Sequence, residues 1–351
     1  MKRNKTIIWI TIILLVIVAF LYYTSSSGTF SSKEKDFAVQ DTATVTKIFL
    51  ADKDNNTILL ERDSTGTWQL NNTYKARQSG VNLLLETLKN LVPKYPVPEN
   101  AHNRIVSLMA SQSVKVEVYQ QVYRVHLSDN LEFFPHEKRT KTFYVGTATA
   151  DNMGTFMLKE GADVPFVVHL LGLRGFVGPR FSTEEANWRD HTIFKTKLFN
   201  IESVTMEMPG DPANSYKVES TGDNFRIVRL IDNQVMPSYD TLKLLNFLTA
   251  FNDIRYETLM NKIQPERMDS VKQTTPFHIL TLTDADGKIS TIKTFHKPND
   301  DGTFDMFGNP YPYDRDRLYG FINDDRDFVL IQFYVFDKVL RPLSYFRPEY
   351  E

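Results

Sequence analysis

A pattern of two strands, a turn and a helix occurs twice in this chain, and this repeat limits the folds open to it. In both copies, residues 47–91 and residues 201–251, strand-like segments and a Ser-Thr-Gly turn precede a helix with one apolar face. Trp68 and Phe225 follow the shared turn in the two copies. The apolar helix positions coincide at a shift of 160, which places Leu84, Leu85, Leu88 and Leu91 on Leu244, Leu245, Leu248 and Phe251.

The segments after each helix also correspond, which extends the repeat to the rest of the chain. Val114, Val116 and Val118 alternate with charged residues, as expected of a half-buried strand, and residues 277–282 take this place in the second copy. Two modules are therefore predicted, residues 45–200 and residues 201–351. Each is expected to be a curved, mainly antiparallel sheet with one long helix packed across it, which makes the predicted class α+β.

These motifs resemble a known family. The segments that carry the resemblance are Gly66-Thr67-Trp68, the leucine-rich helix after it, Lys141-Thr142-Phe143-Tyr144-Val145-Gly146 and the strand Phe166-Val167-Val168. Together they resemble the domain-of-unknown-function family DUF4340, in the form found in Bacteroidetes envelope proteins. The resemblance covers nearly all of the chain beyond residue 44. It implies an envelope or transport-accessory role, beside ABC-transporter components, and it supplies no catalytic residues.

The N-terminus predicts a membrane anchor. Residues 7–23 carry no charge and are apolar on every face, and this length is at the short end of what spans a bilayer. Lys2, Arg3 and Lys5 precede them and place residues 1–6 in the cytoplasm by the positive-inside rule. The prediction is a single-pass protein of the inner (cytoplasmic) membrane, held by the lipid bilayer through residues 7–23. The Ser/Thr-rich residues 24–44 are expected to be a flexible tether to a periplasmic domain.

A cleaved signal peptide is the competing interpretation of this segment. Ser25 and Ser27 imitate a small-residue cleavage site. The apolar run is longer than the usual signal core, however, and two bulky residues, Tyr22 and Tyr23, immediately precede the serines. A retained anchor is the favoured interpretation, although the sequence does not decide whether the segment is cleaved.

The composition excludes several chemistries. The chain has no cysteine, which rules out disulfides, thiolate metal sites and a cysteine nucleophile. Its formal charge is -2, and without the three N-terminal cations 38 basic residues face 43 acidic ones, so no nucleic-acid partner is expected. The sequence holds no nucleophile elbow, zinc-protease motif, phosphate loop or dinucleotide-binding motif. No catalytic residue, metal ligand or cofactor is therefore predicted.

One acidic and aromatic loop, residues 300–316, is the candidate functional segment. Its carboxylates and rings would suit an interaction surface, and the candidate residues are Asp300, Asp301, Asp305, Phe307, Tyr311, Tyr313, Asp314 and Asp316. The simpler alternative is a long connection between two strands. The expected function is a non-enzymatic interaction or accessory role, with a protein partner in an envelope or membrane transport complex. An exported carboxylate-dependent enzyme, or a glycan- or metal-binding module that uses the same loop, is the alternative.

Overall fold

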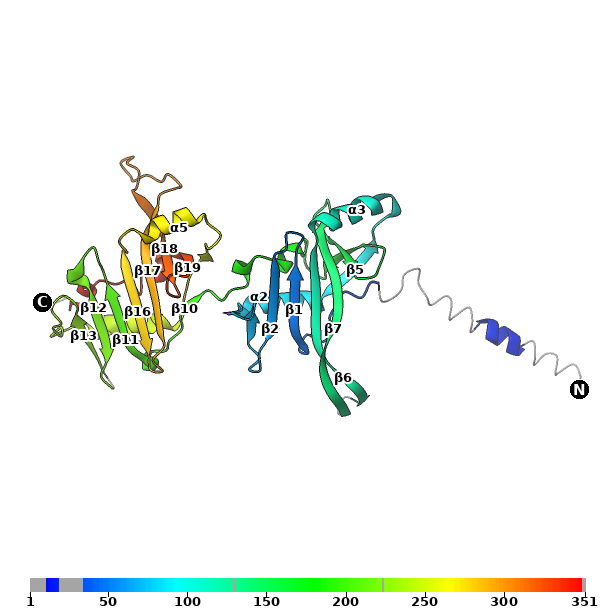
Figure 1. Ribbon diagram of the computed structural model, residues 1–351, viewed down its shortest axis with the longest axis horizontal. Helices are drawn as coiled ribbons and strands as arrows, with labels where there is room; N and C mark the ends of the chain where they lie inside the picture. Colours follow the sequence, from blue (N-terminus) through cyan, green and yellow to red (C-terminus); the bar gives the residue numbers. More distant parts are fainter. Residues whose placement is uncertain (1–10, 19–33, 129–130, 223, 349–351) are drawn as a thin grey trace, which may run out of the picture. The chain divides into compact units, whose positions relative to one another are not determined.

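The chain folds into two compact units, which divide between Asp190 and His191. The computed structural model describes residues 11–18, 34–128, 131–222 and 224–348 (Figure 1). Each unit is built on a large antiparallel sheet with short helices, so the predicted α+β class is confirmed. The sequence repeat predicts a division after residue 200. Residues 191–200 belong to the second unit instead, because β10 (Thr192–Phe194) pairs with β14 (Ile254–Arg255).

The first unit contains a nine-stranded sheet in the order β4-β3-β2-β1-β6-β7-β8-β9-β5. Its strands are β1 (Val45–Ala51), β2 (Thr57–Arg62), β3 (Trp68–Leu70), β4 (Tyr74–Lys75), β5 (Leu91–Pro96), β6 (Val114–Ser128), β7 (Leu131–Ala148), β8 (Thr155–Lys159) and β9 (Phe166–Leu170). The alternating burial of β1 and β2 puts their apolar side chains on one face, as the period of a half-buried strand requires.

The second unit contains an eight-stranded sheet in the order β13-β12-β11-β16-β17-β18-β19-β15. Its strands are β11 (Ile201–Glu207), β12 (Tyr216–Ser220), β13 (Phe225–Arg229), β15 (Thr258–Leu259), β16 (His278–Asp284), β17 (Ile289–Pro298), β18 (Tyr313–Ile322) and β19 (Asp327–Gln332). The two strand orders coincide when β1, β2, β3 and β5 are matched with β11, β12, β13 and β15, and β6 to β9 with β16 to β19. Within these two large sheets, β4 is the one strand without a counterpart, so the topology agrees with the repeat seen in the sequence.

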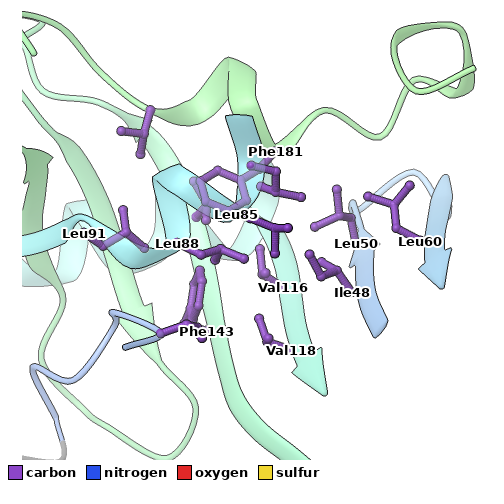
Figure 2. Close-up of a cluster of buried hydrophobic side chains, with 14 of the residues drawn as sticks. Ile48, Leu50, Leu60, Leu85, Leu88, Leu91, Val116, Val118, Phe143 and Phe181 are labelled. Atoms are coloured by element: carbon purple, nitrogen blue, oxygen red, sulfur yellow. The ribbon is translucent and has the colours of Figure 1, made fainter. Parts of the chain in front are cut away.

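The helix predicted for each copy is present but short. The first is α2 (Gln78–Lys89), with 12 residues, and the second is α4 (Thr241–Thr249), with nine. The expected long helix is therefore wrong in length. Strand β5 begins at Leu91, directly after α2, and the proline at position 93 cannot continue a helix. Figure 2 shows how α2 packs: Leu85 and Leu88 lie among Val116, Phe143 and Phe181, which are all buried.

Each unit also contains a second helix that the sequence pattern did not predict. In the first unit, α3 (Glu99–Gln112) buries Ile105 and Met109 in a small cluster of its own. In the second unit, α5 (Pro265–Lys272) packs Met268 and Val271 against another separate cluster. Short helical segments complete the chain: η1 (Gly178–Phe181), η2 (Glu185–Asn187), η3 (Leu198–Asn200), η4 (Pro212–Asn214), η5 (Ala250–Asn252), α6 (Phe333–Phe336) and η6 (Leu343–Phe346).

The segment before β1 corrects the predicted tether of residues 24–44. Phe37 and Val39 are completely buried, and the backbone N–H of Val39 donates to the carbonyl oxygen of Leu88 at the end of α2. In the second unit, the N–H of Thr196 makes the same kind of bond to the carbonyl oxygen of Phe251. The last part of the supposed tether is therefore a structural part of the first unit, because its two apolar side chains complete the core.

Residues 11–18 are helical, and the rest of the predicted anchor, 7–10 and 19–23, lies outside the described residues. Among the residues that the structure describes, no helix is both long enough and apolar enough to cross a membrane.

Candidate interaction site

The connection between β17 and β18 is shorter than the predicted loop of residues 300–316, because Tyr313, Asp314 and Asp316 already belong to β18. The side chain of Asn299 holds the two ends of this loop together. The Asn299 amide donates to the carbonyl oxygens of Thr303 (2.8 Å) and Tyr311 (3.0 Å), and its oxygen accepts the N–H of Thr303 (3.0 Å). The N–H of Tyr311 also donates to the carbonyl oxygen of Thr303. The loop is thus closed at its base by hydrogen bonds, as a small hairpin is.

Asp305 shapes the outer part of this loop. Its Oδ1 accepts the backbone N–H groups of Phe307 and Asn309, both at 2.8 Å, which fixes a tight turn of the kind that Asp favours. Gly308 adopts a positive φ of 84° within the turn, where a side chain would be strained. The hydrogen bonds that Asp305 accepts lower its pKa, and those from Asn309 contribute most. Asp305 is therefore ionised at neutral pH.

The turn presents three large apolar side chains to solvent, at residues 304, 306 and 307. Phe304 is 62% exposed, Met306 89% and Phe307 82%. We call these three residues the apolar turn. Sequence reasoning had named Phe307 but missed Phe304 and Met306, although the run Phe-Asp-Met-Phe is itself unusual for a polar loop. A grouped set of exposed apolar side chains on a hydrogen-bonded turn is typical of a contact surface.

The carboxylates at the base of the loop are neutralised by cations of the same unit. Lys297 lies 3.3 Å from Asp300 and 3.1 Å from Asp314, and Arg267 lies 3.1 Å from Asp300. The hydrogen bond from Lys297 is the main reason that the pKa of Asp300 is lowered. Burial acts to raise the pKa of Asp314, but the N–H of Asp316 and the bond from Lys297 outweigh it and lower the pKa. Asp301 and Asp316 are exposed.

The two tyrosines of the candidate set pack within the unit. Tyr313 stacks on His296, with 4.3 Å between the ring centroids and an angle of 14° between the planes. The ring centroid of Phe277 also lies 4.2 Å from that of His296. The hydroxyl of Tyr311 accepts a hydrogen bond from Arg315, whose guanidinium also lies 4.7 Å from the ring centroid. Both tyrosines are therefore held by neighbouring side chains, although Tyr313 is still 47% exposed.

The hydrogen-bonded carboxylates of this region are held in the ionised form. A glycan hydrolase needs one carboxyl whose pKa is raised so that it can donate a proton. The pKa values of Asp300, Asp305 and Asp314 are all lowered. Within the described ranges, no group of three or more His, Cys, Asp or Glu side chains is placed to hold a metal ion.

The structure thus defines an α+β protein of two topologically equivalent units, whose most distinctive surface is an apolar turn. The chain matches the model of the domain of unknown function DUF4340 over residues 68–276, which is more than half of its length, and it belongs to this family. No curated protein and no solved structure shows significant similarity to it.

Proposed function

We propose that the chain is a membrane-anchored, extracytoplasmic protein without enzymatic activity, which binds a protein partner through the apolar turn. The observation that carries this proposal is the ordered exposure of Phe304, Met306 and Phe307. Water disfavours such exposure, and Asp305 and Asn299 nevertheless hold the loop in the conformation that produces it.

The physical chemistry of the turn suits a protein partner. Aromatic side chains that become buried at the centre of an interface contribute most of its binding energy. Methionine is flexible and adapts to irregular surfaces. Because hydrogen bonds already fix the loop, little conformational entropy is lost on binding. The ion pairs of Asp300 and Asp314 would form part of the polar rim around such a contact.

The proposed location depends on the uncharged residues 7–23 and on the cations that precede them. A single-pass anchor in the cytoplasmic membrane would hold both units on its outer side. The partner would then be an envelope protein, such as a component of a transport complex. A reporter active only outside the cytoplasm, fused after residue 351, should be active, and carbonate washing should leave the full chain in the membrane. Release of the chain by carbonate would contradict the proposed membrane anchor.

Site-specific photocrosslinking tests the partner. A photoreactive phenylalanine analogue at Met306 should give discrete adducts in intact membranes, and mass spectrometry should identify the same partner in each preparation. The same analogue at Tyr334, which is exposed on a different part of this unit, is the matched control. Adding Phe307→Asp to the Met306 probe should remove the adducts. Identical adducts from both positions, or adducts that survive Phe307→Asp, would exclude the apolar turn as the binding surface.

A further inference from the structure

A polar pocket of about 480 Å³ lies in the second unit, beside β10, the start of β17 and the turn between β18 and β19. The residues that line it include Thr192, Lys288, Ser290, Thr291, Asn323 and Arg326. Its volume is within the range of small-molecule sites. Hydroxyl, amide and cationic groups around a hollow favour a polar ligand, because such groups pair with hydroxyls and anions.

The first unit fills the equivalent corner with its own charged side chains. There Lys141 on β7 forms an ion pair with the carboxylate of Asp36. The ammonium of Lys159 on β8 donates to the carbonyl oxygen of the same residue, Asp36, at 2.6 Å. The segment before β1 therefore supplies the anion that pairs with a cation of this corner.

The repeat matches this segment with β10. Asp36 lies three residues before Val39, whose N–H donates to the end of the helix in the first unit. Ile193 lies three residues before Thr196, whose N–H makes the equivalent bond in the second unit. Ile193 therefore stands where the first unit has Asp36, and it carries no charge.

The two lysines of the first unit are also replaced. Ser290 on β17 takes the place of Lys141, and Ile322 on β18 takes the place of Lys159. A serine side chain is much shorter than a lysine side chain, so the second unit has a hollow where the first unit has an ion pair. The cross-strand pairs that establish this equivalence are Val118 with Lys141, Leu282 with Ser290, Phe143 with Lys159, and Ile292 with Ile322.

The charged residues that line the pocket leave one positive charge in excess. Lys288 makes no ion pair within the part of the chain that the structure describes. Arg326 lies 3.9 Å from Asp324, but both side chains are largely exposed, and an ion pair of this kind contributes little. Two cations beside one carboxylate therefore suit a ligand with a single negative charge.

We propose that this pocket binds an acidic saccharide, a sugar with one carboxylate, whose charge takes the place that Asp36 has in the first unit. Lys288 and Arg326 bind the carboxylate through charge-assisted hydrogen bonds. Sugar hydroxyls both donate and accept, which matches the hydroxyl of Ser290 and the carboxylate of Asp324. A doubly charged phosphate ester fits less well, because its second charge is uncompensated beside Asp324. The pocket lining does not include the apolar turn, so this site goes beyond the protein contact proposed above.

Sugar binding to the full-length protein, in nanodiscs of zwitterionic lipid, tests the proposal. In saturation-transfer NMR, glucuronic and galacturonic acid should bind at least about tenfold more tightly than glucose and galactose, in which an alcohol replaces the carboxylate. Inorganic phosphate should displace the acidic sugars only weakly. The proposal would be overturned by equal binding of acidic and neutral sugars, by no saturable binding of either acidic sugar, or by phosphate that competes better than both.

Two variants locate the binding in the pocket. Lys288→Gln should keep the melting temperature of wild type and weaken binding of the acidic sugars by about tenfold, whereas Lys338→Gln, outside the pocket lining, should not weaken it. Ile193→Asp together with Ser290→Lys copies the ion pair of the first unit into the pocket and should abolish binding. Undiminished binding in either folded variant would contradict the site. Phe307→Asp should leave sugar binding unchanged, so this site and the apolar turn can fail independently.

Discussion

The imidazole of His278 packs against the hydroxyl of Thr294 on the neighbouring strand, with 3.0 Å between Nδ1 and Oγ1. Both side chains are buried within the second unit, on β16 and β17. Burial lowers the pKa of His278 to about 4, and the nearby charge of His296, when protonated, acts in the same direction. The folded protein therefore keeps His278 neutral at a pH where an unfolded histidine would already be protonated.

This difference predicts a loss of stability in mild acid. The folded pKa lies below the unfolded value of about 6.5, so the unfolded state binds more protons as the pH falls from 7 toward 4. The free energy of unfolding of the second unit should fall by about 2 kcal/mol between pH 7 and pH 5. Urea unfolding followed by circular dichroism at the two pH values measures this change.

His278→Leu is the control for this effect. This variant should reduce the difference in the free energy of unfolding between pH 7 and pH 5, whatever its effect on absolute stability, because it lacks the buried titrating group. The remaining dependence would come from His296, whose pKa burial also lowers. An unchanged pH dependence in His278→Leu would show that His278 is not responsible.

Phe37 should be essential to the first unit although it lies outside the repeated pattern. It is completely buried, and its ring makes edge contacts with Phe143 and Phe166 at centroid distances of 6.0 and 6.4 Å. Phe37→Ala should destabilise the first unit by about 3–5 kcal/mol. Tryptophan fluorescence during urea unfolding reports on this unit, since Trp68 and Trp188 both belong to it. A cost below about 1 kcal/mol would mean that the segment is only a tether.

The sequence predicted those features that depend on periodicity. The α+β class and the buried leucines of α2 follow from apolar spacing, which the folded chain obeys. Phe37 was missed because an isolated apolar residue in a polar segment has no period, and only the finished core shows where it fits. The additional helix α3 was missed for a related reason, since its apolar face contains little more than Ile105 and Met109.

The candidate site was predictable in composition but not in geometry. The sequence indicated an acidic and aromatic loop, yet it could not show that Lys297 neutralises both Asp300 and Asp314. Those contacts depend on the register between β17 and β18, which pairs Pro298 with Tyr313. The exposure of Leu245 could not be predicted for a different reason. The repeat makes Leu245 equivalent to the buried Leu85, and only the packing of each unit separates the two.

Gly154 should not tolerate even one additional methyl group. A Cβ at this position would lie 2.5 Å from Cγ1 of Val167, a buried side chain on β9. Gly154→Ala should destabilise the first unit by about 1–3 kcal/mol through overpacking. Gly178→Ala is the control in the same unit, because an added Cβ there meets no atom closer than 3.8 Å and should change stability little. Tryptophan-monitored urea unfolding separates the two variants, and equal stability would contradict the predicted clash.

Asp305 should control the order of the apolar turn without affecting the stability of the fold. Asp305→Ala removes the acceptor for the N–H groups of Phe307 and Asn309, and the turn should then open locally. Hydrogen exchange measured by mass spectrometry should become faster in residues 305–310, while the melting temperature stays that of wild type. Asp301→Ala changes the same charge at an exposed position of the same loop and should leave exchange in the turn unaltered.

The same variant connects the order of the turn with the proposed function. If binding depends on a fixed arrangement of Phe304, Met306 and Phe307, Asp305→Ala should reduce the yield of adducts from the Met306 probe although all three side chains are still present. Asp301→Ala should keep the full yield. An undiminished yield in Asp305→Ala, together with faster exchange, would mean that the partner binds the turn without needing it ordered, so the hydrogen bonds of Asp305 would have no part in recognition.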